Sequence, residues 1–122
     1  VSVGELYDKI SILEIKKDKI KDPEKLKYIN EEYKILDEQL KKNVVSNDKT
    51  INLFKSLKEI NSKLWIIEDE KRLCEKNADF GEKFVNLSRN VHLLNDERAK
   101  IKLEINNLTG SKIKEIKEYT NY

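Results

Sequence analysis

Apolar residues recur at every third or fourth position through four separate segments of the chain, and this spacing is what most restricts the fold. In an α-helix such positions lie on one face, so each segment predicts a helix with one apolar stripe. A stripe of this kind needs a second helix to cover it. The most regular stripe, in the fourth segment, consists of Phe84, Leu87, Val91, Leu94, Arg98, Ile101, Ile105 and Leu108.

Turn and capping residues separate the four segments. Ser2 and Glu5 fit a capping box at the start of the first helix, and Asp22-Pro23 supplies a cap and an N1 proline for the second. Ser46, Asn47 and Asp48 favour a turn before the third helix, and Gly110 fits the position after the last one. We predict helices at residues 2–21, 23–43, 49–76 and 80–109, followed by a C-terminal arm at residues 111–122.

These segments predict an all-α fold, an antiparallel bundle of about four helices in a single domain spanning residues 1–122. The short breaks favour two helical hairpins, of which the second is longer. Ile66 and Leu73 lie off the main stripe of the third helix, so a further helix pair, from this chain or from a second copy, should cover them. We therefore predict a homodimer or another homo-oligomer.

Two lysines, Lys17 and Lys71, interrupt the apolar stripes. One polar residue in such a stripe commonly determines helix register or oligomeric state, at some cost in stability. We interpret both lysines in this way.

The charge composition argues against several classes of partner. The chain has 25 Lys+Arg and 23 Asp+Glu, a net charge of +2, and the two signs alternate without forming a basic stripe. This pattern disfavours a nucleic-acid partner. No apolar run approaches the roughly 18–20 residues that cross a bilayer, so no membrane partner is predicted. The single cysteine, Cys74, cannot form an internal disulfide, which fits a cytoplasmic location.

Arginine is rare in this chain, and Arg98 occupies a stripe position where an apolar residue would stabilise a helix pair more. A guanidinium near a core favours a carboxylate or phosphate that accepts two parallel hydrogen bonds. Three interpretations stay open, namely an internal salt bridge, a side chain that reaches the bundle surface, and an anion-binding pocket. In a folded hairpin, the nearest acids to Arg98 are Glu59 and Asp96.

A second group of polar residues lies at the edge of the apolar face of the third helix. Trp65, Glu68 and Arg72 share this edge, while Asp69 and Glu70 point toward water. Glu68 and Arg72 stand four residues apart in the order that favours a surface ion pair worth a few tenths of a kcal/mol. The alternative is a ligand site on the long hairpin, with these candidate residues: Trp65, Glu68, Arg72, Asn95, Asp96 and Arg98.

Known catalytic patterns fit this chain poorly. Helical enzymes that hydrolyse nucleoside triphosphates hold Mg²⁺ between facing pairs of carboxylates, and the acidic pairs of this sequence do not face one another. A zinc site needs several His or Cys ligands, whereas the chain has only His92 and Cys74. We predict no catalytic residue, no metal and no cofactor, and we favour a non-enzymatic role.

Four motifs occur in a familiar order: SVGELYDKISILEIK at residues 2–16, LWIIED at 64–69, NDERA at 95–99 and GSKIKEIKEY at 110–119. Together they resemble a family of small helical bacterial and phage proteins that is known only as domain of unknown function 6165. The resemblance carries no catalytic residue over to this chain. It does imply that the tail belongs to the domain, with Gly110 and Ser111 turning the chain back onto the bundle.

Two main hypotheses are consistent with these patterns. The leading one is a non-enzymatic interaction, assembly or accessory protein that self-associates. The alternative is a small-molecule binding or enzymatic domain for an anionic or sugar-phosphate ligand, with a pocket around Trp65, Arg72 and Arg98. A third hypothesis is a phage-encoded protein that binds a host protein, and the sequence does not distinguish this role from self-association.

Overall fold

The computed structural model describes residues 2–44 and 46–110, and every regular element in this part of the chain is an α-helix. The all-α prediction is therefore confirmed. The predicted arm at residues 111–122 lies outside the described residues. The helices are α1 (Val3–Lys19), α2 (Pro23–Asn43), α3 (Asp48–Lys76) and α4 (Glu82–Thr109).

Side-chain caps fix the starts of α1, α2 and α3 close to their predicted positions. The Ser2 hydroxyl accepts from the Glu5 N–H at 3.2 Å, and the Asp22 carboxylate accepts from the Glu24 N–H at 3.1 Å. Asn47 and Thr50 form a reciprocal capping box at the start of α3. Each cap satisfies an N–H group that has no partner within its helix. Gly110 ends α4 in the left-handed conformation, as predicted.

Two helix ends differ from the prediction by two residues. The first helix ends at Lys19, because Ile20 already has extended backbone angles. The last helix begins at Glu82 after Gly81, and the preceding Ala78 has a positive φ of 52°. Phe80 and Gly81, which the sequence had assigned to the last helix, therefore belong to the turn between α3 and α4.

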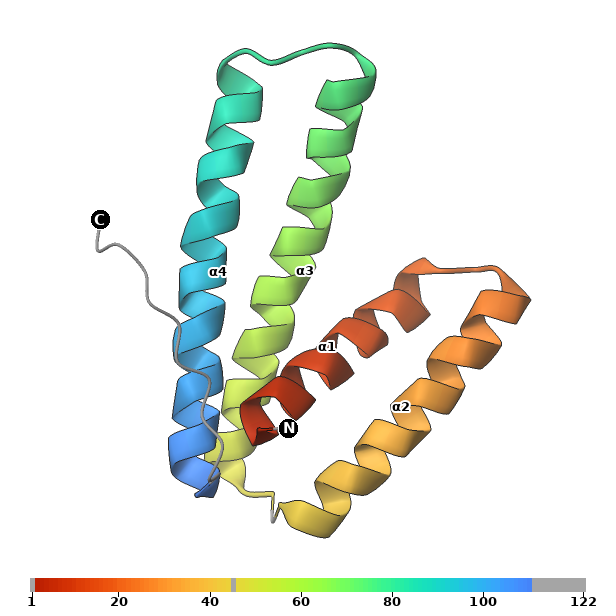
Figure 1. Cartoon of the computed structure of the whole chain (residues 1–122), viewed down its shortest axis with the longest axis vertical. Helices are drawn as coiled ribbons and strands as arrows, with labels where there is room; N and C mark the ends of the chain where they lie inside the picture. Colours follow the sequence, from red (N-terminus) through yellow and green to blue (C-terminus); the bar gives the residue numbers. More distant parts are fainter. Residues whose placement is uncertain (1, 45, 111–122) are drawn as a thin grey trace.

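The four helices form two antiparallel hairpins, and the first lies across one half of the second (Figure 1). Helix α1 is the central element, since it contacts α2, α3 and α4, while α2 contacts only α1. The buried core lies where α1 crosses α3 and α4, around Tyr7, Leu57 and Ile105. The fold is thus a bundle in which α1 holds the two hairpins together.

The two hairpins approach each other closely at Gly4. A β-carbon at this position would overlap the backbone carbonyl oxygen of Lys102 and would lie 2.9 Å from Oδ1 of Asn106. The Gly4 N–H, one of the unpaired donors at the start of α1, donates to the same Asn106 oxygen at 2.6 Å. Glycine is therefore required here for α1 to cross α4 at this distance.

The lysines that interrupt the stripes lie over aromatic rings of the neighbouring helix. The Lys17 Nζ is 4.5 Å from the ring centroid of Tyr33, and the Lys71 Nζ is 5.7 Å from that of Phe84. Both contacts have the geometry of cation–π interactions. Each lysine therefore connects the two helices of its own hairpin.

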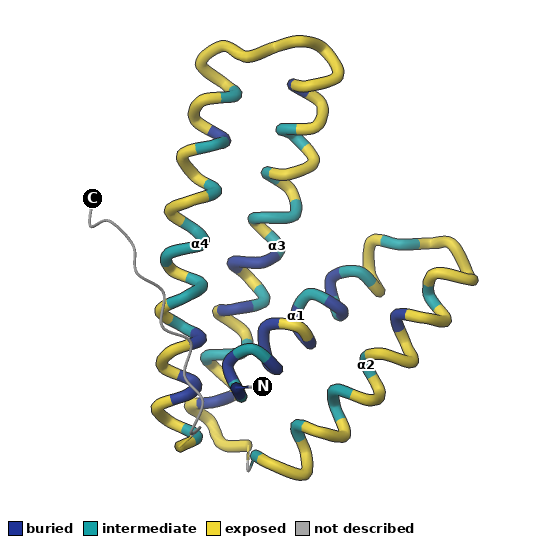
Figure 2. Tube along the Cα trace, in the orientation of Figure 1, coloured by how far each residue is buried: buried dark blue, intermediate teal, exposed yellow. Residues whose placement is uncertain are grey.

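The half of the long hairpin beyond α1 has no other described helix against it (Figure 2). We call this part, residues 65–94, the distal hairpin. Its large apolar side chains include several that are between 46% and 57% exposed: Ile66, Leu73, Phe80, Val85 and Leu93. The first hairpin thus does not cover Ile66 and Leu73, which the sequence had assigned to a further helix pair.

Candidate functional site

An ion pair between a buried carboxylate and a half-buried arginine joins α1 to α4. The Asp8 carboxylate, 1% exposed, accepts from the Arg98 Nε at 2.8 Å through Oδ1 and from the Arg98 Nη2 through Oδ2. Two parallel bonds between a guanidinium and a carboxylate are the strongest arrangement that this pair of groups can form. Asp8 therefore explains why an arginine occupies an apolar stripe position of α4.

Helix α3 contributes to the same network through Asn61. Its Nδ2 donates to Asp8 Oδ1 at 2.9 Å and to the Ser11 hydroxyl at 2.7 Å. That hydroxyl donates in turn to the Asp8 backbone carbonyl at 2.8 Å. Asp8, Ser11 and Asn61 are all buried, so burial of these polar groups is compensated by hydrogen bonds.

A second buried cation lies one turn along α4. The Lys102 Nζ is 2.6 Å from Glu5 Oε2 and 3.9 Å from Asp8 Oδ2. Two carboxylates thus face two cations across the junction of α1 and α4. We call Glu5, Asp8, Arg98 and Lys102 the ion-pair cluster, and its formal charges cancel. Removing one partner of such a buried group leaves an uncompensated charge.

The sequence left open whether Arg98 is paired, solvated or facing a ligand, and the structure pairs it with Asp8. The prediction that Glu59 or Asp96 would be its nearest acid is wrong. Both were chosen from the geometry of the long hairpin alone, whereas Asp8 comes from α1, ninety residues away. One signal was available, because Gly4, Asp8 and Ser11 are small or polar residues on one face of α1 beside its apolar stripe.

A pocket of about 260 Å³ opens beside the ion-pair cluster, where α1 meets the long hairpin. Four of the six predicted ligand-binding residues line it: Trp65, Glu68 and Arg72 of α3, and Arg98 of α4. Asn95 accepts from the Arg98 Nη1 at 3.4 Å, while Asp96 does not line the pocket. The remaining lining residues are Ile12, Ile15, Asn61, Leu64 and Asp69.

The predicted surface ion pair of α3 is not formed. Among the ion pairs of the described residues, none joins Glu68 to Arg72. Both side chains are exposed and line the pocket, together with Asp69, which the sequence had placed toward water. The lining therefore carries two carboxylates and Arg72, beside an Arg98 whose charge Asp8 balances. This pocket has no excess of positive charge.

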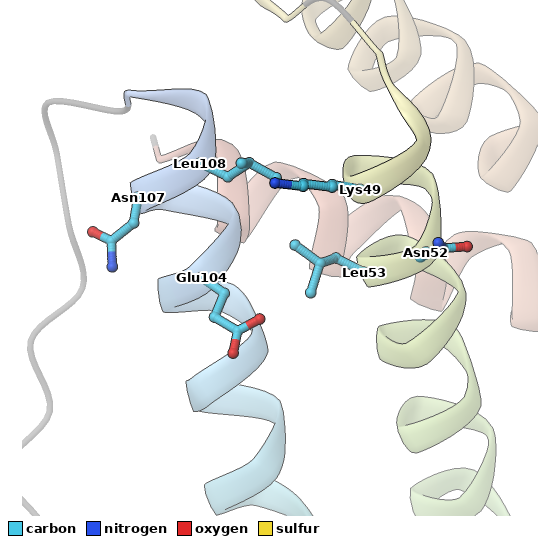
Figure 3. Close-up of a pocket in the computed structure, with 6 residues that line it drawn as sticks. All are labelled: Lys49, Asn52, Leu53, Glu104, Asn107 and Leu108. Carbon is cyan, nitrogen blue, oxygen red and sulfur yellow. The ribbon is translucent and has the colours of Figure 1, made fainter.

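A second, more open pocket of about 560 Å³ lies at the other end of the long hairpin (Figure 3). Lys49 and Leu53 extend from the first turns of α3 toward α4, where Glu104, Asn107 and Leu108 line the opposite side. None of the predicted site residues belongs to it. No group of three His, Cys, Asp or Glu side chains suited to a metal ion occurs within residues 2–44 and 46–110.

The fold and this junction define an all-α protein of two hairpins joined through a buried, charge-balanced network. The chain belongs to DUF6165, a family of unknown function whose model matches residues 1–122. The comparison with curated proteins and the comparison with solved structures give no match. Among the helices of the described segments, none has the length and apolar content required to cross a membrane.

Proposed function

We propose that this protein is a non-catalytic helical-bundle protein that acts through protein–protein contacts, in the first place with a second copy of itself. The observation that supports the proposal is the exposed apolar surface of the distal hairpin. Its two helices project beyond α1 and expose large apolar side chains on both α3 and α4 (Figure 2). Isolated apolar residues are normal on a protein surface, but a group of this kind favours an interaction site.

The geometry of a helical hairpin favours a second copy as the partner. Ile66 and Leu73 are seven residues apart and therefore lie on one face of α3. A pair of helices leaves such outer positions exposed, and two hairpins packed together bury them in a four-helix arrangement. Since the first hairpin leaves this half of α3 and α4 uncovered, an identical hairpin from another copy is the simplest source of the missing helices.

The charge distribution is compatible with association between identical chains. A net charge of +2 and closely alternating signs give two copies little mutual repulsion. Long-range electrostatics is screened beyond about 8 Å at physiological ionic strength, so burial of apolar surface dominates such an interface.

Light scattering coupled to size exclusion tests the proposal. We expect a mass of about twice the 14.4 kDa of one chain at micromolar concentration, falling toward one chain on dilution. A constant mass of one chain across that range contradicts self-association.

A second candidate function is the binding of a small anionic or sugar-phosphate molecule in the pocket around Trp65, Arg72 and Arg98. In favour of this function, Trp65 forms part of the wall and Arg72 forms no ion pair with a described residue. Against it, the Arg98 guanidinium already gives two bonds to Asp8. The candidate therefore depends mainly on Arg72.

The single tryptophan makes this second function straightforward to test. A phosphate or sugar-phosphate ligand in the pocket should change the fluorescence of Trp65, and Arg72→Gln should abolish the change. Arg89→Gln is the matched control, since Arg89 is exposed on α4 and does not line the pocket. An unchanged response in Arg72→Gln rules out this site as the origin of the signal.

A further inference from the structure

A third pocket, of about 380 Å³, lies between the two hairpins, where α1, α2 and the first turns of α3 meet. Its walls are mainly apolar and aromatic, with Tyr7 and Ile10 from α1, Leu40 from α2 and Phe54 from α3. This volume suits a ligand of one or two rings. The pocket is separate from both the ion-pair cluster and the distal hairpin, so a ligand bound here is independent of the proposed self-association.

Tyr7 is the distinctive residue of this pocket. It is only 4% exposed, and its ring stands edge-on to that of Phe54 with 5.7 Å between centroids. Its hydroxyl forms no hydrogen bond with a described residue, yet it is not fully buried, since Asn106 Nδ2 is the one fully buried side-chain polar atom without a partner in the described chain. A phenol that lines a pocket, keeps some exposure at its hydroxyl and lacks a protein acceptor is a hydrogen-bond donor available to a ligand.

Both acids that line the pocket form ion pairs. The Glu14 carboxylate is 3.1 Å from the Lys58 Nζ, and the Asp37 carboxylate is 3.0 Å from the Lys41 Nζ. Two acids and two lysines, Lys55 and Lys58, line the pocket, so it favours neither an anion nor a cation. A charged ligand would lose hydration here without an excess of opposite charge to compensate for it. The chemistry of the lining therefore selects a neutral molecule.

Tyr33 provides a second phenol on the α2 side of the pocket. Burial, followed by the negative charges of Glu14 and Asp37, raises its pKa above 10.0. The group is consequently protonated at neutral pH and is able to donate a hydrogen bond.

We propose that this pocket binds a small neutral aromatic molecule with a carbonyl oxygen that accepts a hydrogen bond from the Tyr7 hydroxyl. The aromatic part of the ligand packs against the ring of Phe54 and the aliphatic walls. Since α2 contacts no described helix except α1, a ligand that touches α1, α2 and α3 also connects α2 to α3. Binding is thus expected to raise the melting temperature.

Three probes with one ring each separate the contributions of the ring, the acceptor and the charge: benzamide, toluene and benzoate. Calorimetric or NMR titration of the full chain should give dissociation constants of about 10 mM or tighter for ligands of this size. We expect benzamide to bind about threefold to tenfold more tightly than toluene, which has no acceptor. Benzoate should bind more weakly than benzamide, because its carboxylate gives up hydration in a pocket whose lining has no excess of positive charge.

The decisive variant is Tyr7→Phe, which keeps the ring and removes only the hydroxyl. It should reduce benzamide affinity to about that of toluene and leave toluene binding unchanged. Tyr28→Phe is the control, because Tyr28 is 65% exposed on α2 and does not line the pocket. Circular dichroism verifies that each variant retains its helices.

A second variant tests the location independently of Tyr7. Ile51 is 43% exposed and lines the pocket, so Ile51→Trp should weaken binding of benzamide and toluene alike by filling space. The proposal is overturned if no probe binds, if Tyr7→Phe preserves the preference for benzamide, or if Ile51→Trp leaves both affinities unchanged.

Discussion

Asp8 on α1 and Arg98 on α4 are joined by two parallel hydrogen bonds, ninety residues apart in the chain and at the point where the two hairpins meet. Asn61 of α3 binds the same carboxylate, so three helices converge on one buried acid. The relative position of the hairpins therefore depends on a polar network as well as on apolar packing.

Removing the charge of Asp8 should destabilise the protein strongly. In Asp8→Asn, Arg98 loses the carboxylate that accepts its two parallel hydrogen bonds, and we expect a loss of about 3 kcal/mol in the free energy of unfolding. Urea denaturation followed by circular dichroism measures this loss. Asp18→Asn is the control on the exposed side of α1 and should change the free energy by less than about 0.5 kcal/mol. Equal losses in the two variants would show that the ion-pair cluster does not stabilise the fold more than an exposed charge does.

Replacing both Asp8 and Arg98 should reduce the free energy of unfolding less than replacing Asp8 alone. In the double variant Asp8→Leu with Arg98→Leu, no buried charge of this pair is left without its partner, so the variant should be more stable than Asp8→Leu alone. Comparison of the unfolding free energies of the single and double variants measures the coupling. Additive losses would contradict a direct interaction between Asp8 and Arg98.

The close approach of α1 and α4 predicts an unusual response to Gly4→Ala. Alanine normally stabilises a helix relative to glycine by about 1 kcal/mol, but here the methyl group would overlap the Lys102 carbonyl. We expect a net loss of about 1–3 kcal/mol, measured by thermal or urea unfolding. Gly81→Ala is the control, since its β-carbon would meet only Asp79 Oδ1 at 3.6 Å. A Gly4→Ala variant as stable as the parent would mean that the helices separate without cost.

Titration of the Tyr33 phenol should make the free energy of unfolding depend on pH in the alkaline range. Because its pKa in the folded chain lies above 10.0, the folded state retains this proton where the unfolded state loses it. Its contribution is therefore fully present below pH 10.0 and is lost as the pH rises through the folded pKa. Phenolate absorbance of the parent minus that of Tyr33→Phe gives the titration of this group alone. A midpoint at or below 10.0 would contradict the described surroundings of Tyr33.

Cys74 offers a probe of opening in the distal hairpin. It is 4% exposed, whereas its neighbour Leu73 is 57% exposed. We expect the thiol to react with a disulfide reagent far more slowly than a free thiol does, at a rate that rises with denaturant. A reaction as fast as that of a small-molecule thiol would show that this part of α3 is open in solution.

The sequence predicts the helices of this fold much better than their arrangement. Apolar spacing and caps locate the four helices to within about two residues, because both signals are local. Spacing does not specify which helices a stripe meets, so the central position of α1 and the exposure of α2 could not be derived. Gly4 was assigned to a cap region, although its role depends on Lys102 and Asn106 at the far end of the chain.

For the candidate site, the sequence predicts which residues of one helix lie together but not which residues of other helices they meet. A helical wheel groups Trp65, Glu68 and Arg72 correctly, since residues of one helix keep a fixed angular relation, and these three line one pocket with Arg98. The partner of Arg98 was not predictable from the long hairpin, because Asp8 belongs to another element. Tyr7 could not be singled out either, as nothing local distinguishes a core tyrosine from one whose hydroxyl lacks an acceptor.

A pair of matched charge substitutions tests whether the chain self-associates through the distal hairpin. One double variant, Ile66→Lys with Leu73→Lys, changes two side chains that are 50% and 57% exposed on α3. The control, Tyr28→Lys with Ile35→Lys, changes two side chains with the same spacing that are 65% and 57% exposed on α2. Since all four side chains are exposed, neither variant should lose helical content.

Light scattering of the parent and both variants at equal micromolar concentration gives the decisive measurement. We predict a dimer for the parent and for the α2 variant, and a single chain of 14.4 kDa for the variant of the distal hairpin. A dimer that survives substitution of Ile66 and Leu73, or one that is lost only in the α2 variant, would contradict self-association through this surface.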